Sequence, residues 1–156
     1  MQTDKTALRE KSKLIRYGMS QNEVMAKSHI INKKLLDEIL WGEIKTILAY
    51  RPIADLNEVS LALENRQGAE IRFIGKSKNQ NLPDRTYDLI IVPTLAFDKD
   101  NYRLGWGGGF YDRLLATQPQ ALKIGLCFAN GFVKEGLPHE PHDIRLDKII
   151  TEQGII

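Results

Sequence analysis

The sequence RLGWGGGFYD at residues 103–112 follows the apolar run DLIIVP at residues 88–93, and together they decide the fold class. The apolar run is typical of a buried strand, and the pattern at 111–117 is typical of a helix. Four glycines in five positions let the backbone approach a ligand without a Cβ in the way, and the first helical turn offers unpaired N–H groups. A strand, a glycine loop and a helix in this order predict an anion site at the end of a strand.

Two charged residues of this stretch favour a phosphate ligand over a merely flexible turn. Arg103 offers a guanidinium fork, and Asp112, about one turn into the helix, is suited to a magnesium ion that bridges phosphates. The loop is not a GxxxxGK[ST] motif, because no Lys-Ser/Thr pair follows the glycines. A Rossmann GxGxxG would need a glycine where Phe110 stands.

The stretch closely resembles the hallmark of the 5-formyltetrahydrofolate cyclo-ligase family, also called methenyltetrahydrofolate synthetases. The match comprises the AFD of residues 96–98, Asn101 and the run 103–113. The resemblance implies catalytic roles for Arg103 and Tyr111. It implies ATP binding by Arg103, Leu104, Gly105, Trp106, Gly107, Gly108, Gly109, Phe110 and Tyr111.

The N-terminal segment carries a second, less specific part of the resemblance. Lys5, Arg9 and Arg16 fall within about 40° of one another on a helix and form one cationic stripe that borders its apolar face. The stripe either looks into a cleft or is a solvated helix face. The resemblance implies that Lys5 and Arg9 contact ATP phosphates and that Arg9 also reaches the substrate.

Near the C-terminus, the segment LPHEPHDIRLD at residues 137–147 resembles a further family motif. The resemblance makes Asp143 the second magnesium ligand beside Asp112, and two carboxylates suit an ion that takes few protein ligands. His139 and His142 have no third partner at zinc spacing, and Cys127 lies in an apolar run, so we expect no zinc site.

The substrate side of the resemblance is weaker. Tyr50 and Glu58 align with the residues that flank the folate, with Glu58 at the pterin ring and Asp55 as the alternative, although Glu58 is equally well explained as an exposed helix residue. Trp106 either stacks on a substrate ring or packs beside the loop. Typical members carry about thirty further residues between the second and third strands, where this chain has only residues 75–87. The folate half of the site is therefore expected to be reduced.

The order of elements predicts an α/β fold. Two N-terminal helices, at residues 3–17 and from a Ser20 cap to about 40, precede strands and helices that alternate. Strands are expected at 46–50, 70–74, 89–92, 123–128 and 148–151, and helices at 57–66 and 111–117. This alternation indicates a three-layer, Rossmann-like sandwich with a mostly parallel sheet, formed by residues 1–156 as a single domain.

Composition agrees with a small cytoplasmic enzyme, and we separately expect a monomer. The net charge of +2 argues against nucleic acid as a partner, and no apolar run is long enough to span a membrane. The resemblance implies conversion of 5-formyltetrahydrofolate to 5,10-methenyltetrahydrofolate, with ATP as co-substrate, Mg²⁺ as cofactor, and ADP and phosphate as products. The alternatives are an ATP-dependent enzyme with a smaller substrate and a catalytically silent nucleotide-binding module.

Overall fold

A six-stranded sheet forms the centre of the protein in the computed structural model, which describes residues 4–63, 68–75 and 81–156. The strand order is β2-β1-β3-β6-β7-β8, and all neighbours run parallel except β7 and β8. The strands are β1 (Thr46–Tyr50), β2 (Glu70–Ile74), β3 (Leu89–Pro93), β6 (Leu122–Leu126), β7 (Lys148–Thr151) and β8 (Gly154–Ile155). A separate antiparallel pair consists of β4 (Ala96–Phe97) and β5 (Arg103–Leu104).

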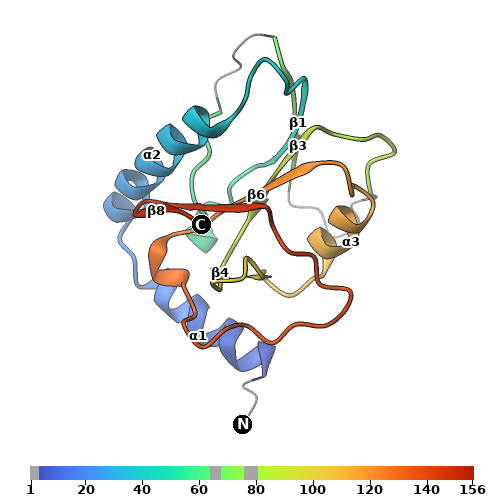
Figure 1. Ribbon diagram of the computed structural model, residues 1–156. Helices are drawn as coiled ribbons and strands as arrows, with labels where there is room; N and C mark the ends of the chain where they lie inside the picture. The colour runs from blue at the N-terminus through green and yellow to red at the C-terminus, as the bar shows by residue number, and fades with distance from the viewer. Residues whose placement is uncertain (1–3, 64–67, 76–80) are drawn as a thin grey trace.

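Helices cover both faces of the sheet (Figure 1), which confirms the predicted three-layer α/β fold. The helices are α1 (Lys5–Tyr17), α2 (Gln21–Glu38) and α3 (Phe110–Ala116), with 3-10 turns η1 (Ala54–Leu56) and η2 (Ala129–Gly131). Leu89 of β3 packs in the same cluster as Leu35 of α2. The next residue, Ile90, packs in the cluster that contains Leu114 of α3. Because both faces are covered, every residue of β3 is buried and the strand is a continuous apolar run.

The helix starts follow their capping residues. The Asp4 carboxylate accepts a hydrogen bond from the Thr6 amide at the start of α1, and Ser20 Oγ accepts one from the Glu23 amide at the start of α2. Each side chain satisfies one of the amides that a first turn leaves without a partner. The Ser20 cap was predicted, and β1, β2 and β7 have the predicted bounds. No helix in the described residues is long and apolar enough to cross a membrane.

The helix expected at residues 57–66 was a wrong prediction. Residues 57–63 are not helical, and residues 64–66 lie outside the described residues. Asn57 has a left-handed backbone with φ of 48°. Asn32 of α2 then accepts a hydrogen bond from the Ala62 amide and donates one to the Ser60 carbonyl. The backbone groups that a helix would pair with each other are thus paired with side chains of α2.

The chain after β3 leads directly to the glycine loop. It forms the β4–β5 pair, whose turn is closed by Asp98, buried and bonded to the amides of Asp100 and Tyr102. Asp98 also accepts from the Leu137 amide, so the C-terminal segment is attached to the same turn. The short strands β4 and β5 were not predicted, because two-residue strands leave no periodicity in a sequence.

Candidate active site

A cavity of about 510 Å³ lies where the glycine loop, α1 and the ends of β1, β2 and β3 meet. It is lined by residues from the whole length of the chain. The sequence-predicted site residues among them are Lys5, Arg9, Tyr50, Glu58, Arg103, Gly105, Trp106, Gly107, Gly108, Gly109, Phe110, Tyr111, Asp112 and Asp143. Leu104 does not line the cavity, because its side chain is buried in β5 beside Ala96 and Leu137. Asp55, the alternative to Glu58, is exposed on η1 and does not line it either.

Arginine side chains hold the backbone of the glycine loop. Arg9 Nε donates to the Gly105 carbonyl at 2.9 Å, and Arg113 Nη1 donates to the Gly108 carbonyl at 3.1 Å. Gly107 has φ of 119°, in a region that side chains other than glycine rarely adopt. The loop is therefore fixed by two cations from two helices, although glycines make it conformationally permissive.

Arg103 is a partly buried cation of the cavity. Its Nη2 donates to the Pro93 carbonyl at 2.9 Å, and its guanidinium lies 5.5 Å from the centre of the Tyr111 ring. Burial lowers the pKa of Arg103, while the negative charge of Asp112 opposes that shift. An arginine keeps its proton even so. Its Nε is buried and has no hydrogen-bond partner in the described structure, which leaves a donor for a ligand.

Tyr111 contributes a hydroxyl that stays protonated. Burial raises its pKa well above the ordinary tyrosine value, and Arg103 opposes the shift without cancelling it. At neutral pH the hydroxyl can therefore donate a hydrogen bond but cannot act as a general base.

The two predicted metal ligands, Asp112 and Asp143, line the same cavity. Asp143 Oδ2 forms an ion pair with Lys5 Nζ at 2.5 Å and accepts the Glu140 amide at 2.8 Å. Burial would raise the pKa of Asp143, but the hydrogen bonds from Lys5 and Glu140 outweigh it and lower the pKa. The described residues contain no group of three or more His, Cys, Asp or Glu that could hold a metal. A pair of carboxylates nevertheless fits magnesium, which binds through one or two carboxylates beside substrate phosphates.

The substrate side of the cavity contains Tyr50 and Glu58. Glu58 is buried, and its Oε2 accepts a hydrogen bond from the Ile53 amide at 2.7 Å. The Tyr50 hydroxyl donates to the Val59 carbonyl at 2.8 Å, so this hydroxyl is already engaged. Sequence reasoning missed Arg51, which also lines this side with its guanidinium 4.8 Å from the centre of the Phe73 ring. It stands between the motif residues Tyr50 and Pro52, and that context was its only signal.

Trp106 lines the cavity beside α1. Its ring centre is 6.2 Å from that of Tyr17, and its Nε1 is buried without a hydrogen-bond partner among the described residues. This geometry leaves room for both predicted roles, packing beside the loop and contact with a ligand.

The predicted cationic stripe of α1 is only partly correct. Lys5 and Arg9 line the cavity, whereas Arg16 is 2% exposed and points into the protein. Its guanidinium donates to the carbonyls of Asn57, Thr94 and Leu95 and lies over the Phe128 ring. Helical phase placed the three cations on one face of α1. The N-terminal part of that face, with Lys5 and Arg9, borders the cavity, whereas its C-terminal part, with Arg16, is buried in the protein interior.

Known proteins resemble this chain over most of its length. The model of the 5-formyltetrahydrofolate cyclo-ligase family matches residues 63–152, which is more than half of the chain. The chain belongs to the 5-formyltetrahydrofolate cyclo-ligase family. A cyclo-ligase of Mycoplasma pneumoniae is 36% identical over an alignment of 171 residues, gaps included, which covers 96% of this chain and 99% of that protein. A second one, from Mycoplasma genitalium, is 31% identical and covers 94% and 97%.

Solved structures give the same family and fold. A 5,10-methenyltetrahydrofolate synthetase from Mycoplasma pneumoniae aligns with a TM-score of 0.77 and 30% identity, covering 96% of this chain and 99% of that one. The fold is also shared by the Aquifex aeolicus synthetase, with a TM-score of 0.73 and 24% identity over 97% of this chain and 91% of that one. A cyclo-ligase family member of nearly the same extent therefore exists.

Proposed function

We propose that this chain converts 5-formyltetrahydrofolate to 5,10-methenyltetrahydrofolate at the expense of ATP, which becomes ADP and phosphate. The observation that carries the proposal is the cavity. It gathers the glycine loop, cations and carboxylates suited to a nucleotide on one side, and Glu58 on the other. Its volume of about 510 Å³ is within the range of small-molecule sites.

The nucleotide side supplies what phosphoryl transfer requires. In the proposed reaction, the formyl oxygen attacks the γ-phosphorus while the bond to the ADP oxygen breaks. N10 then attacks the activated carbon and loses its proton to water, and phosphate leaves with the C–O bond electrons to give the methenyl bridge. Positioning and positive charge do most of the work in such a transfer. Lys5, Arg9 and Arg103 surround the loop with that charge, and the Tyr111 hydroxyl is a donor toward the transferred group.

Asp112 and Asp143 are the residues that we propose to hold Mg²⁺. Bound there with ATP, the ion would neutralise charge on the phosphate oxygens. Despite burial, the hydrogen bonds from Lys5 and Glu140 lower the pKa of Asp143, so its carboxylate is ionised at neutral pH, as a magnesium ligand must be.

On the other side of the cavity, we propose that Glu58 binds the pterin ring, with Tyr50, Arg9 and Trp106 beside it. A buried carboxylate held by the Ile53 amide is a fixed acceptor for the N–H groups of such a ring. We further propose that the protein acts as a monomer and that the reaction takes place in the cytoplasm.

The test is incubation with 5-formyltetrahydrofolate, ATP and magnesium while the absorbance of the methenyl product is followed. We expect product, and we expect Glu58→Ala to lose folate-dependent ADP release while ATP binding by calorimetry stays within about twofold of the parent. The proposal fails if ATP binds but no 5-formyltetrahydrofolate binding is detected at millimolar concentration with nucleotide present. A panel of smaller substrates, followed by ADP release, would then separate another ligase from a silent nucleotide-binding module.

A further inference from the structure

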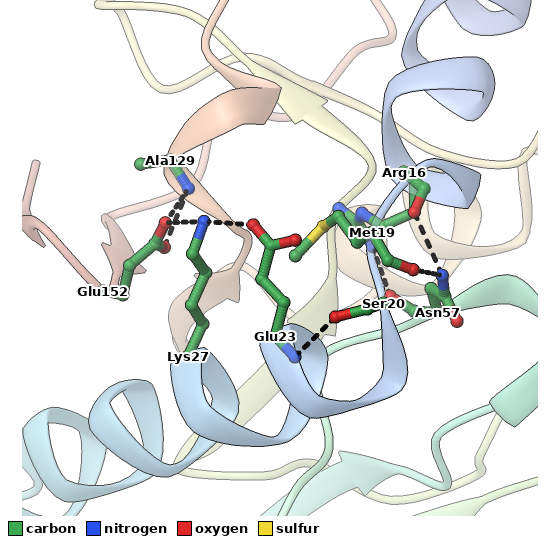
Figure 2. A network of polar contacts seen from close by, with 8 residues as sticks. All are labelled: Arg16, Met19, Ser20, Glu23, Lys27, Asn57, Ala129 and Glu152. Atoms are coloured by element: carbon green, nitrogen blue, oxygen red, sulfur yellow. Dashed lines mark hydrogen bonds and ion pairs between the residues drawn. The ribbon is translucent and has the colours of Figure 1, made fainter.

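The C-terminal end of α1 and the turn at Asn57 are joined by hydrogen bonds in both directions. Figure 2 shows Asn57 reaching the backbone of Arg16 and Met19, to whose carbonyls its Nδ2 donates at 3.1 Å each. In return, Arg16 Nη1 donates to the Asn57 carbonyl at 3.3 Å. Gln21 Nε2 donates to Asn57 Oδ1 at 2.9 Å, so the amide group of Asn57 is used at both ends. This junction fixes a left-handed residue, a conformation that asparagine tolerates better than most residues.

The same guanidinium also holds the chain that leaves β3. Arg16 Nη2 donates to the Thr94 carbonyl at 2.9 Å and to the Leu95 carbonyl at 3.2 Å. The preceding carbonyl, of Pro93, accepts from Arg103. Arg103, which lines the cavity, and Arg16, which does not, therefore bind consecutive carbonyls of one short segment.

Both residues lie behind the cavity wall, since neither Arg16 nor Asn57 lines it. Asn57 immediately precedes Glu58 on one side of the cavity, and the carbonyls of residues 93–95 adjoin the anchor of Arg103 on the other. We infer that Arg16 and Asn57 are positioning residues, which hold Glu58 in register with the Arg103 side of the site. The inference rests on the proposed function, in which Glu58 and Arg103 must be aligned so that the folate lies in line with ATP.

The chemistry of the junction explains why these residue types are needed. A buried guanidinium has five donors in a fixed fork and can serve several carbonyls at once, which a lysine ammonium on a flexible stem cannot do with the same geometry. An asparagine side chain both donates and accepts, so it can bridge the Arg16 and Met19 carbonyls and the Gln21 amide together. The ring of Phe128 covers the guanidinium, with 4.9 Å from Cζ to the ring centre.

Asn32 provides a matched control for a role in stability alone. It is buried to the same degree, 7% exposed against 8% for Asn57. Its side chain makes three hydrogen bonds, two of them to the same extended segment at Ser60 and Ala62, farther along the chain from Glu58. Neither Asn32 nor those two residues line the cavity. Loss of Asn32 therefore weakens the attachment of the segment without releasing the residue next to Glu58.

The experiment compares Asn57→Gly with Asn32→Ala in steady-state kinetics and in thermal unfolding. Glycine keeps the left-handed backbone and removes only the side-chain bonds. We expect Asn57→Gly to raise KM for 5-formyltetrahydrofolate about tenfold with KM for ATP within about twofold, the effect of a misplaced substrate contact. Asn32→Ala should lower Tm by a comparable amount with both KM values within about twofold. An unchanged folate KM in Asn57→Gly, or an equal rise in Asn32→Ala, overturns the inference.

Two further variants complete the test. Asn57→Asp keeps the preference for the left-handed turn and an acceptor for Gln21 but loses the Nδ2 donors, so it should show the same KM pattern even if Asn57→Gly is unstable. Glu58→Ala separates this inference from the proposed function. If Glu58→Ala binds folate like the parent, the proposed role of Glu58 is wrong. If Glu58→Ala is impaired while both Asn57 variants bind normally, only the positioning role is wrong.

Discussion

Replacement of Gly105 by alanine should disable Arg103 without unfolding the protein. A Cβ at position 105 would lie 2.5 Å from Arg103 Nη2, whereas ordinary van der Waals contact begins at 3.4 Å. The guanidinium must therefore retreat by about 0.9 Å, the difference between these distances. A retreat along its bond to the Pro93 carbonyl would lengthen that bond from 2.9 Å to about 3.8 Å, beyond hydrogen-bonding range.

The cost in activity should exceed the cost in stability. A displacement of about 1 Å of a positioning group reduces rates by up to about 100-fold, so we expect kcat/KM for ATP to fall between about 10-fold and 100-fold, or roughly 1.4–2.8 kcal/mol. For folding, the lost hydrogen bond costs about 1 kcal/mol. A glycine-to-alanine change returns about 0.4–1 kcal/mol by restricting the unfolded chain, provided that the backbone suits alanine. These two terms nearly cancel, so Tm should change by only a few degrees.

The assay is ATP-dependent formation of the methenyl product by Gly105→Ala, Arg103→Ala and the double variant. If alanine acts through Arg103, the double variant should be no worse than Arg103→Ala, because the effects of coupled residues do not add. Gly42→Ala is the matched control, since a Cβ there meets nothing within 4 Å and the residue lies outside the cavity. Parental kcat/KM for ATP in Gly105→Ala, or fully additive losses in the double variant, would refute the reasoning.

Three further predictions concern charge and proton positions. Asp112→Asn should reduce ATP turnover at limiting magnesium by more than about tenfold while the fold survives, and parental turnover there would remove Asp112 from the metal site. Tyr111→Phe should lower kcat without altering the pH profile of kcat between about 6 and 9, because burial, the largest influence on this hydroxyl, raises its pKa above that range. Loss of an alkaline limb from the pH profile in this variant would contradict the prediction. Amide hydrogen bonds from Lys45 and then Thr46 outweigh burial and lower the pKa of Asp88, so the stability that this carboxylate contributes is present at neutral pH and is lost as the pH falls below about 4. Asp88→Asn should thus lower Tm by about 2 °C at pH 7 and by progressively less as the pH falls below about 4, and a difference that stays constant with pH would count against the assignment.

The sequence predicted best where one local pattern determines the outcome. The apolar runs of β1, β2 and β7 have their predicted bounds, and the glycine stretch contains the residues that line one side of the cavity. The family resemblance also linked Lys5 to the same site as Asp143, which no local pattern does.

The failures occurred where distant contacts determine the conformation. A helix was predicted at residues 57–66, but residues 57–63 are not helical, and the side chain of Asn32 pairs with their backbone at Ser60 and Ala62. Arg16 has the same helical phase as Lys5, yet its neighbours are carbonyls from two other segments. Helical phase gives the direction of a side chain and not what lies in that direction. Arg113 could have been found, since it ends the matched motif, but its bond to the Gly108 carbonyl depends on the folded loop.

The ion pair between Lys5 and Asp143 has a consequence for the protein during its synthesis. The two residues are 138 positions apart, and the glycine loop lies between them in the sequence. A chain still growing on the ribosome therefore exposes the cations of α1 long before the carboxylate that pairs with Lys5 has been made. Until then, Lys5 lacks this partner, and the cavity lacks one of its two predicted metal ligands. A prematurely ended chain that stops before residue 143 therefore cannot form this ion pair, and its Lys5 stays without this partner.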